Sequence, residues 1–300
     1  MQRFFLFAVL FISLAQCSTQ TDLLALRSFY EATGGTNWTN NAGWNNGTSE
    51  VYCDWFGIEC NVTSDKLRID LSHNNLVGQI SPNFTLLNIT HLNLSNNTLY
   101  GSLSEFFFPE IKELDLSHNK LNGSIDLYFY NSTKLRHLDL SNNSFSGNIS
   151  ELIGNMRRLE YVDLSHNQFL GPVPGELGSP RLLYHLDISH NQFNGSLPSS
   201  LSENPLDTLM VQNNSLVQVE YHMNFEVAVP KNCDLSNNPL ICPMPKWAKE
   251  KCRAVCDPMW SAASIVTTVF VSLFLMGSIA YFIWFFIDRK RANDSYTRIS

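Results

Sequence analysis

The sequence predicts a curved, right-handed α/β solenoid with a parallel sheet on its concave face, a helical N-terminal cap, disulfide-bonded caps and one transmembrane helix. Three observations predict this fold. A motif recurs every 22 to 24 residues, cysteines stand at both ends of the repeated region, and a charge-free apolar stretch lies near the C-terminus. A fixed period of this length indicates stacked coils, because a single coil cannot bury its own apolar side.

Each repeat unit is organised around one Asn. Apolar residues stand three and five positions before it, as Leu138 and Leu140 do before Asn143, and this alternation predicts a short strand with one buried face. A Leu or Phe stands two positions after the Asn, and in most units a Gly stands four positions after it. The central residues of the eight units are Asn74, Asn97, Asn119, Asn143, Asn167, Asn191, Asn214 and Asn238.

The buried position of these Asn residues has a physical reason. The chain must turn inward after each strand, which brings backbone N–H and C=O groups into the core. An unpaired group there costs about 1–3 kcal/mol. A carboxamide has donors and an acceptor. We therefore expect each Asn to bond the backbone of its own turn and of the neighbouring coil.

The best-kept units are "LRHLDLSNNSFSGNI" (Leu135–Ile149) and "LEYVDLSHNQFLGPVP" (Leu159–Pro174). They resemble the 24-residue leucine-rich repeats of extracellular plant receptor-like proteins and polygalacturonase inhibitors. The resemblance covers about Asp22 to Cys256. The seventh unit, "LDTLMVQNNSLVQVEYH", lacks the Ser and the Gly, and the eighth, "CDLSNNPLIC", leads directly into a cap.

The segment before the repeats predicts a cap over one end of the core. We expect a helix that begins at Thr21 or Asp22 and ends at Gly34–Gly35. Its apolar residues are Leu23, Leu24, Leu26 and Phe29, and Trp38, Trp44 and Trp55 are expected to fill the core end. The stretches "ATGGTNW" and "CDWFGIEC" match the N-terminal cap of the same family, which implies a disulfide between Cys53 and Cys60.

Four further cysteines follow the repeats: Cys233, Cys242, Cys252 and Cys256. Four cysteines allow three pairings, and the sequence does not choose among them. A secreted, oxidising environment favours disulfides over zinc for these residues. No metal ligand and no cofactor site is therefore expected.

Both ends of the chain carry targeting signals. Residues 1–17 combine an early Arg3 with a short apolar run, which is typical of a secretory signal peptide, and a cut after Cys17 leaves an even number of cysteines. Met259–Ile287 is uncharged and long enough to cross a membrane. These signals predict a single-pass protein with its N-terminus outside, at the plasma membrane or alternatively in the endolysosomal membrane.

The expected organisation is a signal peptide (1–17), an N-terminal cap (18–65), the leucine-rich repeats (66–231), the last repeat with a cysteine cap (232–258), a transmembrane helix (259–287) and a cytoplasmic tail (288–300). The region between signal peptide and tail carries a net charge of −10, which argues against nucleic acid as a partner. The chain lacks G-x-S-x-G, Walker and HExxH motifs, and an open sheet offers no pocket to exclude water. We therefore expect no enzymatic activity.

Recognition is expected on the concave sheet, where the residues between the strand leucines point outward. Large side chains of the middle units are the candidate ligand-binding residues: Arg136, His137, Asp139, Tyr161, Asp163, Tyr184, His185 and Asp187. The Asp residues recur in successive strands. They are either an acidic stripe for a basic peptide or amine, or a residue common at this place in the repeat. The neighbouring His residues are either a pH-sensitive surface or a similar habit of the repeat.

Thirteen sequons are candidates for N-glycosylation: Asn37, Asn46, Asn61, Asn83, Asn88, Asn93, Asn96, Asn122, Asn131, Asn142, Asn148, Asn194 and Asn213. Glycans on Asn93, Asn96 or Asn142 would cover part of the concave face and move binding towards Tyr161 and His185. In the tail, Tyr296 and Ile299 resemble the tyrosine-based sorting signal of endocytosed receptors. The alternative is a solvated tail whose basic residues lie on anionic lipid.

Together these features predict a cell-surface leucine-rich-repeat receptor-like glycoprotein that binds a protein, peptide or glycan ligand. A tail of 13 residues is too short for a kinase, so any signalling is expected to pass through a co-receptor. The alternative is an adhesion, structural or endolysosomal membrane glycoprotein. An enzyme inhibitor like the polygalacturonase inhibitors is disfavoured by the membrane anchor.

Overall fold

The computed structural model describes residues 20–45, 51–61, 63–103, 106–220, 222–223, 225 and 229–256. The chain divides into two compact units, Met1–Leu240 with Met244–Val255, and Ile241–Pro243 with Cys256–Ser300. The expected signal peptide, transmembrane helix and tail lie outside the described residues. Within the described residues, no helix has the length and apolar character needed to cross a membrane.

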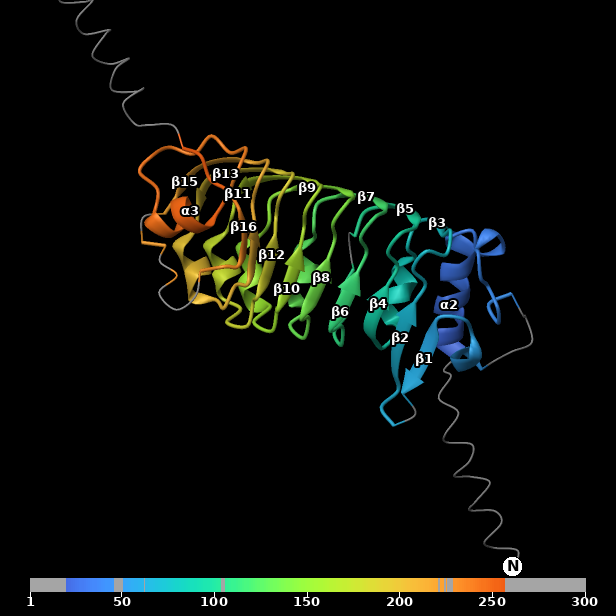
Figure 1. Ribbon diagram of the computed structural model, residues 1–300. Coiled ribbons are helices and arrows are strands. Elements are labelled where there is room, and N and C mark those ends of the chain that lie inside the picture. The colour runs from blue at the N-terminus through green and yellow to red at the C-terminus, as the bar shows by residue number, and fades with distance from the viewer. Residues whose placement is uncertain are drawn as a thin grey trace, which may run out of the picture. The chain divides into compact units, whose positions relative to one another are not determined.

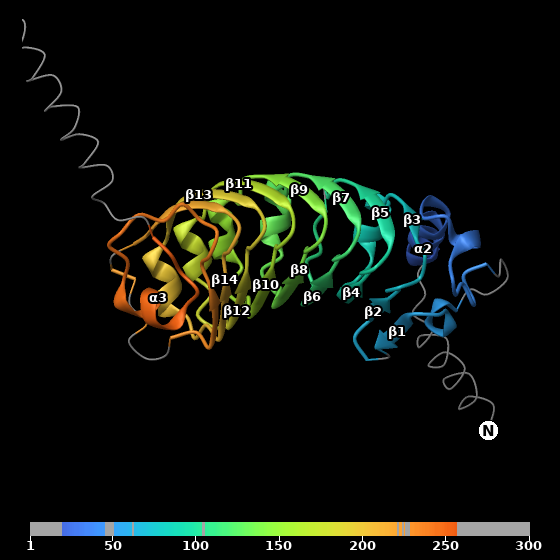
Figure 2. The ribbon, with the colours of Figure 1, turned by 45° about the horizontal axis from the view of Figure 1, so that its top comes forward.

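The first unit is a solenoid, and its principal sheet has nine strands among the described residues. In spatial order these are β1 (Ile58–Asn61), β2 (Lys66–Asp70), β4 (Ile89–Asn93), β6 (Glu113–Asp115), β8 (His137–Asp139), β10 (Tyr161–Asp163), β12 (His185–Asp187), β14 (Thr208–Met210) and β16 (Asn232–Asp234). β1 pairs with β2 in antiparallel fashion, and the following strands pair in parallel. We call this the inner sheet, because the coils of this unit form an arch with the sheet along its inner side (Figure 2).

A second parallel ladder joins the coils after their inward turn, and the sequence reasoning did not predict it. It contains β3 (Val77–Gly78), β5 (Thr98–Gly101), β7 (Lys120–Gly123), β9 (Ser144–Gly147), β11 (Gln168–Pro172), β13 (Gln192–Leu197) and β15 (Ser215–Val219). Short 3-10 helices complete the coils: η3 (Pro82–Leu86), η4 (Leu127–Asn131), η5 (Glu151–Asn155), η6 (Gly175–Gly178) and η7 (Ser199–Glu203). Figure 1 shows the strands following one another along the unit in chain order.

The core consists of equivalent residues stacked coil upon coil. Leu138, the middle residue of β8, and its counterparts Leu114, Val162 and Leu186 are each at most 1% exposed. Behind the turn, Phe145, Phe169 and Phe193 stack with centroid distances of 6.2 and 6.1 Å. Burying one such side chain stabilises the fold by about 1.5–3 kcal/mol. The repetition therefore produces a core that continues from unit to unit.

The Asn prediction is confirmed. The Oδ1 atom of Asn119 accepts the N–H of Leu99 at 2.9 Å, and its Nδ2 donates to the carbonyl of Leu94 at 3.0 Å, both one coil earlier. Nδ2 also donates to the carbonyls of Leu116 and Ser117 in its own coil at 3.1 Å. The carboxamide thus replaces the backbone partners that the turn removes.

Equivalent bonds recur at Asn143, Asn167 and Asn191 with nearly the same distances. The first rung differs, since the Oδ1 and Nδ2 atoms of Asn74 bond the backbone N–H and C=O of Asn40 in the N-terminal cap. The carboxamides therefore tie the repeats to the cap as well as to one another.

The residue before each Asn has a positive φ, which explains why it is His or Asn. The φ values are 53° at His73, His118 and His190, 54° at His166, and 54–56° at Asn142, Asn96 and Asn213. Asn and His are enriched in this left-handed region, whereas β-branched residues are strained there. The alternation of "SHN" and "SNN" is thus a requirement of the turn, which gives these histidines a conformational role.

The N-terminal cap begins with α2 (Gln20–Ala32), and η1 (Gly35–Asn37) and η2 (Tyr52–Asp54) follow. The expected helix is present, and of its apolar residues Leu26 and Phe29 are buried, whereas Leu24 is 60% exposed. Ala25 is also buried, so the packed face of the helix contains Ala25, Leu26 and Phe29.

The three cap tryptophans fill the end of the core, as predicted. Trp38, Trp44 and Trp55 are each at most 5% exposed, and Trp44 contacts both of the others at centroid distances of 4.9 and 5.1 Å. Phe29 of α2 stacks on Phe84 of η3 at 4.2 Å, which joins the cap to the first coil. The structure also contains the Cys53–Cys60 disulfide.

The structure chooses one of the three pairings left open for the last four cysteines. Cys233 of β16 is bonded to Cys252, just after α3 (Lys246–Lys251), and Cys242 is bonded to Cys256. The first bond and the Trp247 indole, which donates to the Met223 carbonyl at 2.8 Å, fasten α3 over the last coil. The second bond lies within the second unit.

Candidate ligand-binding face

On the inner sheet, equivalent residues of successive coils form two columns whose side chains point away from the core into solvent. The first column runs through Arg68, His91, Glu113, His137, Tyr161, His185 and Thr208, which pair strand by strand. The second column runs through Asp70, Asn93, Asp115, Asp139, Asp163, Asp187 and Met210. Neighbouring strands lie about 4.8 Å apart, so each column presents its side chains as a closely spaced row.

Three rings in the first column form a continuous stack, here called the ring stack: His137, Tyr161 and His185. Tyr161 lies 4.1 Å from the ring of His137 and 4.1 Å from that of His185, with interplanar angles of 12° and 8°. The ring of Tyr184 meets Tyr161 edge-on at 6.5 Å. The sequence named all four residues as candidates, and the structure brings them together.

Burial disfavours the charged forms of two members of the ring stack, Tyr161 and His185. Burial, opposed by the charges of Asp163 and Asp187, lowers the pKa of His185. Burial also raises the pKa of the Tyr161 hydroxyl, and the Asp163 carboxylate acts in the same direction. The Nε2 atom of His185 is buried and makes no hydrogen bond with a described residue. The ring stack is therefore a strip of aromatic rings that runs beside the Asp residues of the second column.

Arg136 stands apart from the ring stack. Its Nη1 atom lies 3.1 Å from Oε1 of Glu160, the residue that precedes the first-column tyrosine on the next coil. This places the guanidinium in an ion pair along the edge of the sheet. Among the predicted candidates, Arg136 is thus the residue whose positive charge is already paired with a carboxylate of the next coil.

The Asp residues of the second column, here called the Asp column, each make the same backbone contact. Asp115 Oδ1 accepts the N–H and the hydroxyl of Ser117 at 2.9 and 2.7 Å. Asp139, Asp163 and Asp187 accept the N–H of the Ser two residues on at 2.8–2.9 Å. These bonds close the turn after each strand. They support the interpretation of Asp as a structural residue of the repeat.

Burial raises the pKa of Asp139 and of Asp163, although the bonds from Ser141 and Ser165 oppose it. The neighbouring Asp carboxylates act in the same direction as burial. Like charges at this spacing repel. The middle of the Asp column therefore gains protons more readily than free carboxyl groups do.

A depression of about 470 Å³ lies further towards the N-terminus, and the sequence did not predict it. Its lining residues are Gly57, Ile58, Glu59, Arg68, Ile69, Asp70, His91, Leu92, Asn93, Glu113, Asp115 and His137. The open sheet thus contains a hollow that is itself open to solvent. β1 runs antiparallel beside β2 and extends the sheet beyond the repeats, so the hollow is bounded on that side.

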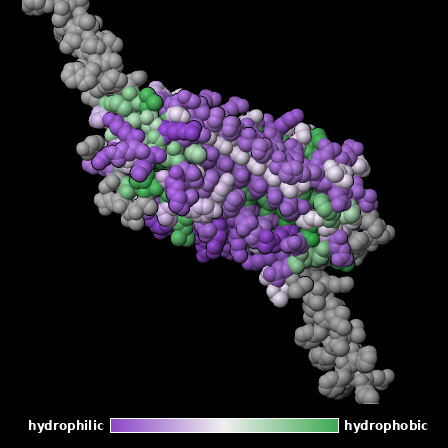
Figure 3. Space-filling view, viewed as in Figure 1, coloured by the Kyte–Doolittle hydropathy of each residue, from purple (hydrophilic) through white to green (hydrophobic). Residues whose placement is uncertain are grey.

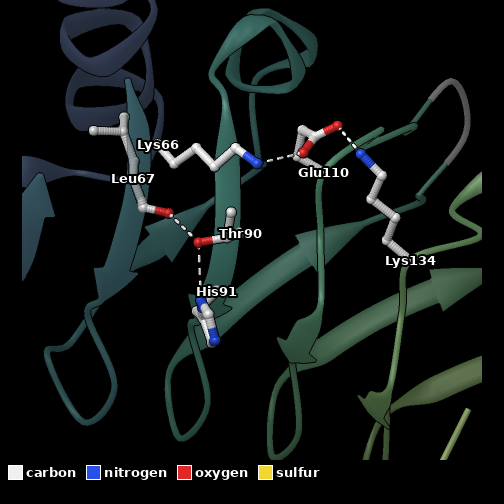
Figure 4. A network of polar contacts seen from close by, with 6 residues as sticks. All are labelled: Lys66, Leu67, Thr90, His91, Glu110 and Lys134. Atoms are coloured by element: carbon white, nitrogen blue, oxygen red, sulfur yellow. Dashed lines mark hydrogen bonds and ion pairs between the residues drawn. The ribbon is translucent and has the colours of Figure 1, made fainter. Parts of the chain in front are cut away.

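The polar lining of the depression is organised around His91. Thr90 Oγ1 lies 3.0 Å from the Leu67 carbonyl and 2.9 Å from Nδ1 of His91 (Figure 4). Beside this chain, the Glu110 carboxylate lies between the ammonium groups of Lys66 and Lys134 (Figure 4). On the open side, Nε2 of His91 lies 3.4 Å from Oε1 of Glu113, and Arg68 Nε lies 3.7 Å from Oε2 of Glu59.

The described sequons lie at the surface of the molecule. Every sequon Asn in the described part is at least partly exposed, and Asn93 lines the depression. Asn46 and the Tyr296–Ile299 motif lie outside the described residues. Among the described residues, no group of three or more His, Cys, Asp or Glu side chains has the geometry to hold a metal ion.

The surface of the first unit is mostly hydrophilic in the view of Figure 3, and hydrophobic residues form small separate areas there. On the inner sheet, polar groups line the depression and rings form the stack. His137 belongs to both. The two features are therefore one continuous surface.

Family models match the chain in four places. A leucine-rich-repeat model matches residues 109–169, a second matches residues 88–109 and 182–204, and a model of the leucine-rich-repeat N-terminal domain matches residues 19–61. A search of curated proteins found no match.

Solved structures with similar folds include extracellular domains of plant receptors. The ectodomain of the Arabidopsis receptor kinase HAESA, in complex with an IDA peptide hormone ligand, is 29% identical, with 63% of this chain and 32% of that chain covered and a TM-score of 0.56. The plant peptide hormone receptor RGFR1, in complex with RGF2, is 27% identical, with 58% and 28% covered and a TM-score of 0.52. The chain belongs to the plant-type extracellular leucine-rich-repeat family.

This leucine-rich-repeat protein spans less than a third of either receptor chain. A plant ice-binding protein is also similar, with 25% identity, 75% of this chain and 73% of that chain covered, and a TM-score of 0.64. Members of similar fold therefore include proteins with different ligands.

Proposed function

We propose that this leucine-rich-repeat protein is a receptor-like protein that binds an extended peptide along its inner sheet and has no catalytic activity of its own. The observation that carries the proposal is the continuity of the depression with the ring stack through His137. Together they cross the strands from β2 to β12, which is about 24 Å at the usual strand spacing. An extended peptide covers that distance with about seven or eight residues.

The character of this surface supports a peptide ligand. The ring stack and Tyr184 offer aromatic contact area with few rotatable bonds, and aromatic residues dominate binding hot spots. The binding residues of the proposal are His137, Tyr161, Tyr184 and His185, with Asp139, Asp163 and Asp187 beside them and Arg136 at the edge. The similar HAESA ectodomain, whose structure contains a peptide hormone ligand, and the similar peptide hormone receptor RGFR1 support the same interpretation.

The membrane arrangement belongs to this proposal too. We place the repeats outside the cell and the uncharged stretch 259–287 in the plasma membrane, with signalling through a co-receptor that owns an enzymatic domain. N-linked glycans on the sequons away from the inner sheet would shield the remaining surface.

The test is a selection of randomised eight-residue peptides on the full chain in mild detergent. The variant Tyr161→Ala removes the centre of the ring stack, and Tyr128→Ala removes an exposed tyrosine on η4 as the matched control. We expect selected peptides that bind the native chain and the Tyr128 variant but lose most of their affinity for the Tyr161 variant. Selected peptides that bind all three proteins alike would contradict the proposed site.

The alternative function is an adhesion or endolysosomal membrane glycoprotein, favoured by the Tyr296–Ile299 motif. In that case Tyr296→Ala should cause accumulation at the cell surface and loss from acidic compartments. An unchanged distribution of the Tyr296 variant would favour the receptor-like function.

A further inference from the structure

The hydrogen bonds of Thr90 determine which nitrogen of His91 carries the proton. The Leu67 carbonyl can only accept, so the single hydroxyl hydrogen of Thr90 is donated to it at 3.0 Å. Thr90 Oγ1 must then accept from His91, 2.9 Å away, which requires a hydrogen on Nδ1. A neutral His91 consequently has its lone pair on Nε2.

This Nε2 atom points at another acceptor. It lies 3.4 Å from Oε1 of Glu113, and two acceptors at that distance gain nothing from each other. Burial lowers the pKa of His91, and the charges of Arg68 and Lys112 act in the same direction, whereas Glu113 opposes them. The ring is therefore neutral at neutral pH. The result is a pair of acceptors that lacks a donor.

The surrounding charges define the donor that fits. The depression is lined by the carboxylates of Glu59, Asp70, Glu113 and Asp115 and by one cation, Arg68. Arg68 approaches Glu59 at 3.7 Å, on the far side from Glu113. A group with several N–H donors and a positive charge would bond His91 and Glu113 together and balance the remaining carboxylates.

We infer that the depression binds a guanidinium or primary ammonium group of the peptide ligand, held between His91 Nε2 and Glu113 Oε1. The inference rests on the proposed function, because it assigns a side-chain class to the ligand of the same surface. His91 on β4 and Tyr161 on β10 are three strands apart, or about 14 Å. The cationic residue and the residue over the ring stack are therefore about four positions apart in an extended peptide.

The experiment uses the randomised eight-residue peptides and the full chain in mild detergent. We expect Arg or Lys to be enriched at one position, with an aromatic or apolar residue about four positions away. Replacing the Arg by citrulline, which has the same shape without the charge, should weaken binding about tenfold or more. Agmatine, a free guanidinium, should compete only at far higher concentration than the peptide.

The variant Glu113→Gln should abolish the preference for Arg over citrulline. Glu203→Gln is the matched control, since both carboxylates are 55% exposed and Glu203 pairs with Arg181 away from the inner sheet. Peptides that bind without enrichment of a cation, or with a preference that survives in the Glu113 variant, would overturn the inference but leave the proposed function standing. Failure to select any peptide would overturn both. Agmatine that competes as well as the peptide would assign the depression to a free amine.

A second measurement does not depend on Glu113. Protonation of Nε2 turns His91 from an acceptor into a donor, so the Arg peptide should bind more weakly at pH 5.5 than at pH 7.5. His91→Asn supplies an acceptor that does not titrate, and this pH dependence should disappear in it. A pH dependence that is equal in both proteins would contradict the role assigned to His91.

Discussion

Oδ1 of Asn143 accepts the backbone N–H of Leu121, one coil earlier, at 3.0 Å. The same carboxamide donates to the carbonyls of Leu116, Leu140 and Ser141. One side chain thus satisfies backbone groups in two consecutive coils. The stability of the solenoid depends on these polar contacts as well as on its leucines.

The substitution Asn143→Ala removes all of these bonds at once. We expect a loss of about 1–3 kcal/mol in the free energy of unfolding, because buried backbone groups are left without partners. Chemical denaturation of the full chain measures the loss. Gln168→Ala, at an exposed position of β11, is the control and should be nearly neutral. Equal stabilities of the two variants would show that water replaces the carboxamide.

The substitution Leu140→Ala tests the apolar part of the core. Leu140 is fully buried, so the truncation leaves a cavity and should cost about 2–5 kcal/mol. Leu170→Ala provides the comparison, since Leu170 is 43% exposed on β11 and its loss should change stability by about 0.5 kcal/mol or less. Thermal unfolding of both variants measures the difference. A small effect at Leu140 would mean that neighbouring coils collapse into the space.

Gly57 sits at the border of the depression with a φ of 78°, and a Cβ atom there would lie 2.2 Å from the Asp70 carbonyl oxygen. Gly57→Ala should therefore destabilise the β1–β2 pairing by at least about 1 kcal/mol. At Gly175 a Cβ atom would have its nearest neighbour at 3.9 Å, so Gly175→Ala should be tolerated. Hydrogen exchange of the β1 amides is the measurement. Unchanged protection in the Gly57 variant would contradict the steric argument.

The Glu110 carboxylate gives the stability a specific pH dependence. Its bonds from Lys134 and Lys66 lower its pKa from 4.5 to about 2. A pKa lowered on folding stabilises the native state above the unfolded value, and that stabilisation is lost as the pH falls from about 4.5 towards 2.

The melting temperature of Glu110→Gln should accordingly lie below that of the native chain at pH 6–7, and the gap should narrow as the pH is lowered to about 3. Glu203→Gln is the control for an exposed ion pair with Arg181, and its effect should be small. A gap that remains constant over this pH range would show that Glu110 acts through packing alone.

The repeat period and the alternation around Asn143 were enough to predict the coils, the parallel inner sheet and the two columns, because each follows from local patterns that recur in register. The burial of Trp38, Trp44 and Trp55 followed from the need to close an open core end. The exposure of Leu24 was not predictable, because consecutive leucines do not reveal which face of a short helix packs inward.

The depression could not be predicted from the repeats, since it depends on β1, which pairs antiparallel with β2 outside the repeat pattern. The acceptor pair of His91 and Glu113 was missed for a related reason. The two residues occupy the same column in different coils. In addition, the tautomer of His91 depends on the hydrogen bonds of Thr90, and no pattern in the sequence points to Thr90. The recurrent "SHN" carries a signal of the positive φ at His118 and its counterparts, but from the sequence it was interpreted only as a pH-sensitive surface or a habit of the repeat.

Because every rung from Asn97 to Asn238 presents nearly the same bonds to its neighbour, a whole unit can be added or removed without altering the joint it leaves. The position of such a change decides its effect on recognition. An extra unit after β12 leaves the spacing between His91 and Tyr161 untouched, whereas one between β6 and β8 lengthens it by a strand's width of about 4.8 Å. A change in the number of repeat units between these two residues would therefore change the length of the peptide that fits, in steps of one strand spacing.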